Sequence, residues 1–422
     1  MSESVVFPRF RWFVIVALCL VTAGTAMVMI SPAPLIGVIA KATGLSLGEV
    51  AGITMGTFNL FMAISALVGG FLIDRFGIVR VWFVSIVVVF LGAALVPVAG
   101  DSVTGMTVVR AMVGCGTGPI MASAAALAAQ WFPLSERGTV TGVQGFSVSL
   151  GVALGFVVVP ATLQSTGSWQ VALAWMSVSM VIAFVFAMIV ALGGKPPVQQ
   201  EVKGENVGSG VDFKKALLLV ATWAGIGCAF LNSWEYQAFN DLTPSYLAVE
   251  PPVGLGFGPM GAGKFMMVAQ IAYMLGSLLS GIIAEKVFAG RARPMVMIGA
   301  VVSAVCCFSV KFSGVCTSDS LLLLALILFG FFAGLVNPQV YAFIAKNYPE
   351  HITGKIGGLT IALGGFGATI GVAAGAFALH TTGFYWMSVN LVAIVGIAGF
   401  IIGVLLNPPK VFGSSKSQSF KA

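Results

Sequence analysis

Charge is the scarcest feature of this 422-residue sequence, since Asp, Glu, Lys and Arg together make up 8% of it. A water-soluble protein covers its surface with such residues, so this composition excludes a soluble globular fold. Histidine occurs only as His351 and His380, and neither has a second histidine or a carboxylate at metal-ligand spacing. The six cysteines also lack metal spacing. With no nucleophile–base set either, the sequence predicts neither an enzyme nor a metal site or cofactor.

The sequence is instead rich in long apolar stretches. Hydrophobic residues make up 58% of the chain, and the mean hydropathy is +1.03. A helix needs roughly 20 apolar residues to cross a bilayer. Twelve stretches meet this need, and they predict an all-α membrane protein: 12–40, 50–73, 79–99, 103–130, 139–163, 169–192, 215–239, 260–284, 294–313, 319–345, 355–379 and 384–406. Pro32 and Pro34 interrupt the first of them.

The basic residues lie mainly in alternate loops. If the N-terminus is cytoplasmic, 17 of the 21 Lys and Arg residues are cytoplasmic too. They are Arg9, Arg11, Arg75, Arg80, Arg137, Lys195, Lys203, Lys214, Lys215, Lys286, Arg291, Arg293, Lys346, Lys355, Lys410, Lys416 and Lys421. The outer side keeps few bases and several acids, Asp241 among them. Both termini are therefore predicted to be cytoplasmic, in a bacterial inner membrane, and the net charge of +7 requires no nucleic-acid partner.

The stretch from Trp131 to Gly155 has a counterpart 216 residues later. Seven Gly and Pro positions recur at this offset: Gly114, Gly118, Pro133, Gly138, Gly142, Gly151 and Gly155 match Gly330, Gly334, Pro349, Gly354, Gly358, Gly367 and Gly371. Repeats of this size in an apolar chain are typical of secondary transporters. We expect a six-helix bundle at 1–192, a cytoplasmic linker at 193–215, a second bundle at 216–406 and a cytoplasmic tail at 407–422.

Two loop motifs and a helix motif carry a family resemblance. A Gly-x-Leu-x-Asp-Arg-x-Gly pattern spans Gly70, Asp74, Arg75 and Gly77, and a related turn holds Glu285 and Lys286. The helix motif is an arginine followed by glycines in the fourth helix, at Arg110, Gly114, Gly116 and Gly118. With the repeat and the twelve spans, these motifs make the chain similar to the major facilitator superfamily of secondary transporters.

The resemblance implies two pseudo-symmetric six-helix bundles that expose a central site alternately to either side of the membrane. The paired loop motifs would then act in conformational gating. The glycine rows of the fifth and eleventh helices would let partner helices approach closely. The helix-five signature of drug antiporters, built on a Gly-Pro pair, is absent from the run Gly145 to Gly155.

Charges inside the spans are few, and each costs about 2.5–3.5 kcal/mol at mid-helix. Arg110 is either a cation near the substrate or a structural partner for a buried carbonyl or acid. Glu235 lies on one helix face with Cys228 and Asn232, where a carboxyl could exchange a proton near neutral pH. The alternative is that this helix ends early, before the Thr243-Pro244 turn, and leaves Glu235 in solvent.

Polar residues elsewhere complete the predicted pathway. Helix eight presents Gln270 and Tyr273, while Lys264 points away from them and can reach the outer interface. Helix ten presents Asn337 and Tyr341 on one face, and helix five presents Gln144. Helix two adds Asn59.

These residues favour proton-coupled import of a small organic anion, such as a carboxylate, by a monomer in the lipid bilayer. Proton-driven efflux of drugs or apolar metabolites is the alternative, with Phe58, Phe146 and Phe156 lining an apolar cavity. A transporter-like sensor would need a docking domain, and the tail of 407–422 is too short for one.

Overall fold

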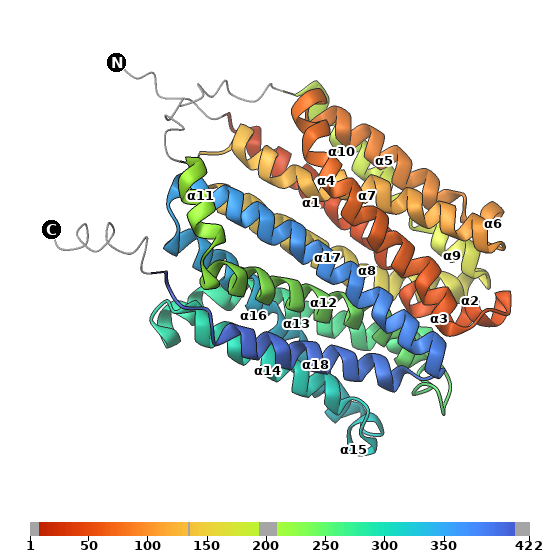
Figure 1. The fold of residues 1–422 in the computed structure, drawn as a ribbon. Helices are drawn as coiled ribbons and strands as arrows, with labels where there is room; N and C mark the ends of the chain where they lie inside the picture. The colour runs from red at the N-terminus through yellow and green to blue at the C-terminus, as the bar shows by residue number, and fades with distance from the viewer. Residues whose placement is uncertain (1–7, 134–135, 194–208, 410–422) are drawn as a thin grey trace. The chain divides into compact units, whose positions relative to one another are not determined.

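The computed structural model describes residues 8–133, 136–193 and 209–409, which are helical and contain no strand (Figure 1). The first half contains α1 (Arg11–Ile30), η1 (Ala33–Leu35), α2 (Ile36–Thr43), α3 (Leu47–Ala51), η2 (Gly52–Gly56), α4 (Thr57–Phe76), α5 (Ile78–Ala94), α6 (Val96–Ala99), α7 (Val103–Trp131), α8 (Arg137–Thr166), α9 (Trp169–Trp175) and α10 (Val178–Leu192). The second half contains α11 (Ser209–Leu217), α12 (Val220–Ala248), α13 (Gly258–Phe288), α14 (Ala292–Ser309), α15 (Ser313–Cys316), α16 (Asp319–Asn347), α17 (Glu350–Thr382) and α18 (Tyr385–Gly403).

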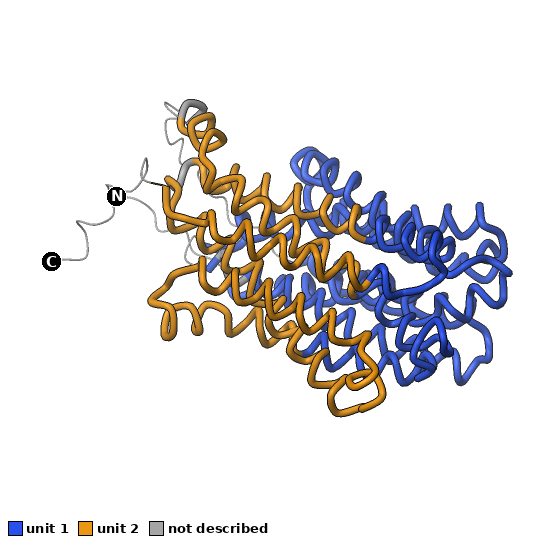
Figure 2. The backbone as a smooth tube through the Cα atoms, turned by 60° about the horizontal axis from the view of Figure 1, so that its bottom comes forward, with its two compact units in different colours: residues 1–201, 240–271, 372–388 blue, residues 202–239, 272–371, 389–422 orange. Residues whose placement is uncertain are grey.

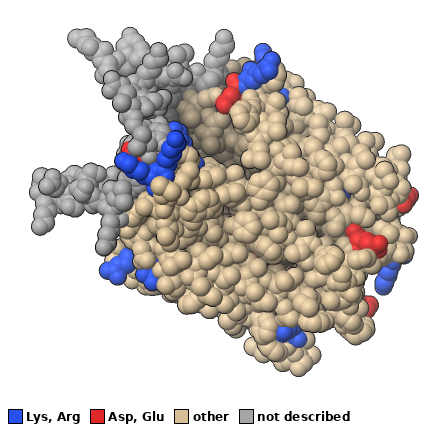
Figure 3. All heavy atoms as spheres, in the orientation of Figure 1, with Lys and Arg blue, Asp and Glu red and all other residues tan. Residues whose placement is uncertain are grey.

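Ten segments of the described chain are long and apolar enough to cross a membrane. Two more helices complete the predicted twelve spans: α5, with 17 residues, and α12, which has 29 residues, several of them polar. Apolar side chains such as Val84 on α5, Val185 on α10 and Ile401 on α18 are exposed by half or more. On the face in Figure 3, Lys and Arg lie near helix ends and the stretch between them is uncharged. The protein therefore crosses the membrane several times.

The first span is interrupted at its prolines, as the sequence predicts. Pro32 has no N–H to donate to the Val28 carbonyl, and the helix gives way to the short 3-10 turn η1 before α2 continues to Thr43. The second span contains the π-helix η2, whose wider turn leaves backbone carbonyls without their usual α-helical partner. Both breaks lie beside the buried arginine described below.

The described residues divide into two compact units (Figure 2). Unit 1 comprises residues 1–201, 240–271 and 372–388, and unit 2 comprises 202–239, 272–371 and 389–422. In unit 1, α1 packs on α8 and α10, while α4 and α5 pack on α7. In unit 2, α14 packs on α16. The predicted division at 193–215 stays a prediction, since residues 194–208 and 410–422 lie outside the described residues.

Glycines allow the close helix packing that their repeat predicts. In unit 1, a Cβ on Gly151 of α8 would overlap the Ala23 carbonyl of α1. In unit 2, a Cβ on Gly367 of α17 would overlap the Phe230 carbonyl of α12. The predicted close approach at these two repeat-related glycines is confirmed.

One predicted boundary is wrong. The seventh span was expected to end at residue 239, but α12 continues to Ala248 with Pro244 inside it. The proline removes one backbone donor without ending the helix. As a result Asp241, expected among the acids of the outer side, has no exposed surface, and Glu235 is 1% exposed rather than solvated.

Candidate functional site

Arg110 is the buried cation of unit 1. Its side chain projects from α7 and is 3% exposed. Its Nε donates to the Thr54 carbonyl at 2.6 Å, and its Nη1 and Nη2 donate to the carbonyls of Val28 and Met29 at 3.3 and 2.9 Å. These acceptors lie at the two helix breaks: Val28 precedes Pro32, and Thr54 is inside the π-helix. The guanidinium thus replaces donors that the backbone has lost.

A buried acid accompanies this arginine. The Nδ2 atom of Asn59 donates to Asp241 Oδ2 and to the Met55 carbonyl, both at 2.9 Å. The Asp241 carboxylate also interacts electrostatically with Arg110, whose guanidinium lies 5.0 Å from the centre of the Phe58 ring. The carbonyls around Arg110 carry no net charge, so Asp241 is the group that offsets its positive charge.

Sequence reasoning missed Asp241. The Thr243-Pro244 pair predicts a turn, and a turn there places this acid outside the membrane. Phe239, Leu242 and Leu247 follow a helical spacing across that pair and are buried. This apolar periodicity was the available signal that α12 continues.

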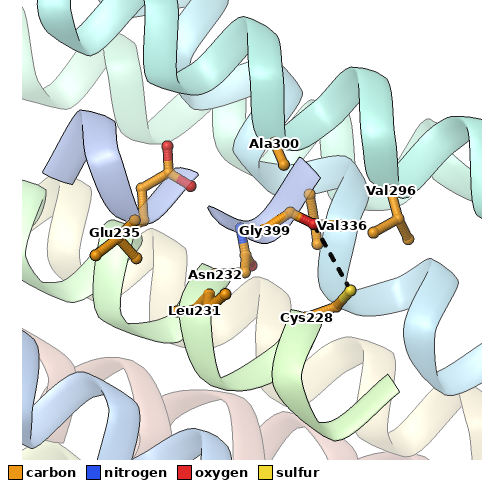
Figure 4. Close-up of a pocket in the computed structure, with 9 residues that line it drawn as sticks. Cys228, Leu231, Asn232, Glu235, Val296, Ala300, Val336 and Gly399 are labelled. Atoms are coloured by element: carbon orange, nitrogen blue, oxygen red, sulfur yellow. Dashed lines mark hydrogen bonds between the residues drawn. The ribbon is translucent and has the colours of Figure 1, made fainter. Parts of the chain in front are cut away.

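Glu235 is the buried acid of unit 2 (Figure 4). It projects from α12 into a pocket that α14, α16 and α18 close, and the pocket is lined by Cys228, Leu231, Asn232, Val296, Ala300, Val336, Val395 and Gly399. Ser303 interacts with the carboxyl group of Glu235, but the Oε1 atom of Glu235 has no hydrogen-bond partner. Among the described residues, no basic side chain pairs with Glu235.

The surroundings of Glu235 are built from small and polar residues of the same unit. Asn232 is 3% exposed, and its Nδ2 lies 3.4 Å from the Ala333 carbonyl while its Oδ1 has no partner. A Cβ on Gly396 of α18 would stand 2.9 Å from Glu235 Oε1, so the absence of a side chain there makes room for the carboxyl. The structure therefore brings Glu235, Asn232 and Cys228 together, as their helical spacing predicts.

Three tyrosines and an asparagine form a second polar group in unit 2. The rings of Tyr236 and Tyr273 stack with centroids 4.1 Å apart. Tyr341 of α16 lies close enough to Tyr273 for an electrostatic interaction, and it is 37% exposed. Asn337, one turn before Tyr341, has a buried Oδ1 without a partner. Such hydroxyl and amide groups can bind the oxygens of a polar ligand.

Gln144 and Gln270 belong to unit 1. Gln144 donates from Nε2 to the Met121 carbonyl at 2.9 Å, which ties α8 to α7. Gln270 is 2% exposed on α13. Lys264, on the same helix, is exposed, and its direction relative to the polar stripe stays a prediction.

Phe58 and Phe156 have no exposed surface. Phe58 stacks beneath Arg110, and the Phe156 carbonyl occupies the space beside Gly263. These two rings are part of the helix packing, and Phe146 is half-buried.

The predicted gating motif forms a sharp turn at the end of α4. Gly77 adopts φ = 83°, a left-handed conformation that favours glycine, and α5 begins at the next residue. Asp74 and Arg75 are exposed, and Gly70 has open space where a side chain would stand. Glu285 and Lys286 are likewise exposed near the end of α13. Their role in gating stays a prediction.

Comparison with known proteins gives the family context. The family model described as Major Facilitator Superfamily matches residues 16–360 and 228–421. The hexuronate transporter of Bacillus subtilis (strain 168) is 26% identical over 352 residues, covering 79% of this chain and 80% of that protein. The cis,cis-muconate transport protein of Acinetobacter baylyi is 28% identical over 369 residues, covering 83% of each.

Among solved structures, a crystal structure of a D-xylose-proton symporter superposes with a TM-score of 0.75. The alignment covers 94% of this chain and 97% of the symporter at 16% sequence identity. This likeness shows a shared fold, and it agrees with the twelve-span all-α architecture predicted from the sequence.

Proposed function

Because the chain belongs to the Major Facilitator Superfamily, we propose that it carries a small organic anion across the membrane together with a proton. Two of its relatives are a hexuronate transporter and a cis,cis-muconate transport protein. Hexuronate and muconate are both carboxylates, although one is a sugar acid and the other an unsaturated dicarboxylate. The shared feature of these compounds is the carboxylate group, so the proposed substrate class is a small carboxylate rather than a sugar or a drug.

The observation that carries the proton coupling is the isolation of Glu235. A buried carboxylate with no cation beside it is costly, and Glu235 is 1% exposed with one oxygen unpartnered. Taking up a proton removes the charge, and opening of unit 2 to water would allow the proton to leave. In our proposal Glu235 is the proton carrier, and Ser303 holds its carboxyl group in position.

Arg110 is the proposed source of positive potential for the substrate. Its three donor groups bond to neutral carbonyls, so its full charge remains in unit 1, and Asp241 is the acid among the described residues that offsets it. We propose that Asp241 is the counter-charge in the absence of substrate. A carboxylate that approaches this cluster would take over part of that role.

The polar side chains predicted to line the pathway would recognise the rest of the substrate. Tyr273, Tyr341 and Asn337 offer hydroxyl and amide groups in unit 2, and Gln144 and Gln270 offer amides in unit 1. On this proposal the protein works as a monomer in a bacterial inner membrane with both termini cytoplasmic. The motifs at Asp74–Arg75 and Glu285–Lys286 would control its alternation between two states.

Uptake into proteoliposomes tests the proposal. Labelled glucuronate and cis,cis-muconate are offered to vesicles that contain the full-length protein, with and without an imposed pH gradient that is acidic outside. Labelled glucose is the matched neutral control. We expect uptake of at least one carboxylate, stimulated by the gradient, and no glucose uptake. Glucose uptake at the same rate would contradict the substrate class, and carboxylate uptake indifferent to the gradient would contradict proton coupling.

A further inference from the structure

A cavity of about 530 Å³ lies in unit 2, apart from the proposed transport residues. It is formed where α14 begins, where α16 ends and just beyond the end of α18. Its volume falls within the range of roughly 300–1,000 Å³ typical of small-molecule sites. Its charged lining residues are Arg291, Arg293 and Lys346, and no acidic residue is among the described residues that line it.

The positive charges of this cavity are arranged for an anion. The Nη1 atom of Arg293 donates to Asn407 Oδ1 at 2.8 Å, which holds one guanidinium in place. Arg291 is the N-cap of α14 and its side chain makes no cap, so it does not occupy the N–H groups of Ala292 and Arg293 at the start of this 18-residue helix; the third residue, Pro294, has no N–H. Arginine forks and a lysine ammonium together match the tetrahedral oxygens of a phosphate group.

The remaining walls of the cavity combine the polar residues Gln339, Asn347 and Asn407 with apolar side chains. Met297, Phe343 and Leu406 line it alongside the cations. The adjoining helices also carry apolar side chains on their outer surfaces: Ile298 of α14 is 36% exposed, and Ile397 and Ile401 of α18 are 49% and 60% exposed. In a membrane protein such side chains face lipid. A ligand that carries both a phosphate and an acyl chain fits this combination better than a free ion.

We propose that this cavity binds the phosphate headgroup of an anionic phospholipid. The headgroup lies among Arg291, Arg293 and Lys346, and the acyl chains run along the exposed faces of α14 and α18. Basic pockets between membrane helices bind lipid headgroups by the same physics. A lipid bound there would link the ends of three helices of unit 2.

Native mass spectrometry of the purified full-length protein tests this site. The protein is titrated with phosphatidylglycerol and, separately, with zwitterionic phosphatidylcholine, and the bound fraction is measured. Arg291→Gln and Lys346→Gln are the test variants, because both side chains are exposed and their removal leaves the helix packing intact. Lys311→Gln is the control, since it removes the same charge just beyond the opposite end of α14. Thermal unfolding checks that all variants are folded.

The expected result is a preference for phosphatidylglycerol, weakened about fivefold by each test variant and unchanged in the control. A competition arm separates the two sources of phosphate. Inorganic phosphate and glycerol phosphate in millimolar excess should leave the lipid bound. Equal binding of the two lipids, an equal loss in the Lys311→Gln control, or displacement of the lipid by free phosphate would each overturn the proposal.

Discussion

Arg110 in unit 1 and Glu235 in unit 2 are both buried, but their charges are stabilised to different degrees. In unit 1, every donor atom of Arg110 has an acceptor and Asp241 offsets its charge. In unit 2, Glu235 has one unpartnered oxygen and no basic side chain beside it among the described residues. A buried charged group that has hydrogen-bond partners and a counter-charge is suited to stay charged. A buried carboxyl group that lacks them is suited to change its protonation state. This contrast supports our proposal that Arg110 keeps its charge and that Glu235 carries the proton.

The largest expected effect comes from Arg110→Gln. The substitution leaves Asp241 buried without its counter-charge and weakens the bonds to the carbonyls of Val28 and Thr54. We expect a loss of about 3–5 kcal/mol of stability and no measurable uptake. Thermal unfolding of the purified protein gives the stability readout.

A second variant makes this prediction sharper. Arg110→Gln combined with Asp241→Asn removes both charges together, so it should unfold at a higher temperature than Arg110→Gln alone. If the double variant were the less stable of the two, the assignment of Asp241 as the counter-charge would be wrong.

Glu235→Gln should separate proton coupling from substrate movement. Glutamine keeps the shape of the side chain but cannot release a proton, so uptake driven by a pH gradient should fall at least about tenfold, equivalent to about 1.4 kcal/mol. Exchange of labelled for unlabelled substrate without a gradient should stay within about twofold, because it needs no net proton movement. Wild-type uptake should rise as the external pH falls, and the variant should show a flat profile.

Glu250→Gln is the matched control for that variant. Glu250 is exposed beyond the end of α12, so the same change there should leave gradient-driven uptake intact. A flat pH profile in both variants would mean that the effect does not come from the buried carboxyl.

Substitutions of matched glycines test whether the helices of the two units pack in the same way. Gly151→Ala in unit 1 and Gly367→Ala in unit 2 would each push a methyl group into a facing backbone carbonyl. We expect each to cost about 1–3 kcal/mol, measured as a lower unfolding temperature. Gly145→Ala and Gly365→Ala meet open space and should be neutral or stabilising by up to about 1 kcal/mol. A cost at only one of the two packed glycines would break the parallel between the units.

Lys264→Gln should have the smallest effect. Lys264 is exposed near the start of α13, in contrast to the buried Arg110, so its long side chain can reach the membrane interface. Uptake should change by less than about twofold in proteoliposomes. A loss as large as that of Arg110→Gln would place Lys264 in the substrate pathway.

Much of the fold follows from the sequence because membrane helices carry a strong signal. The break at Pro32, the glycine packing at Gly151 and the isolation of Glu235 can all be predicted from local rules of proline, glycine and charge. The partners of Arg110 could not, since backbone carbonyls have no sequence signature. The position of Asp241 could not be predicted because a Thr-Pro pair normally suggests a turn, and only the packed structure shows that α12 continues through Pro244.

Proton movement itself is the most direct measurement of the proposed role of Glu235. Vesicles loaded with a pH-sensitive dye receive the transported carboxylate from outside, at equal starting pH on both sides. Our account predicts that the interior acidifies when the wild-type protein carries the anion, and that it does not acidify with Glu235→Gln although the anion still exchanges. Equal acidification by the two proteins would contradict the proton-carrying role of Glu235.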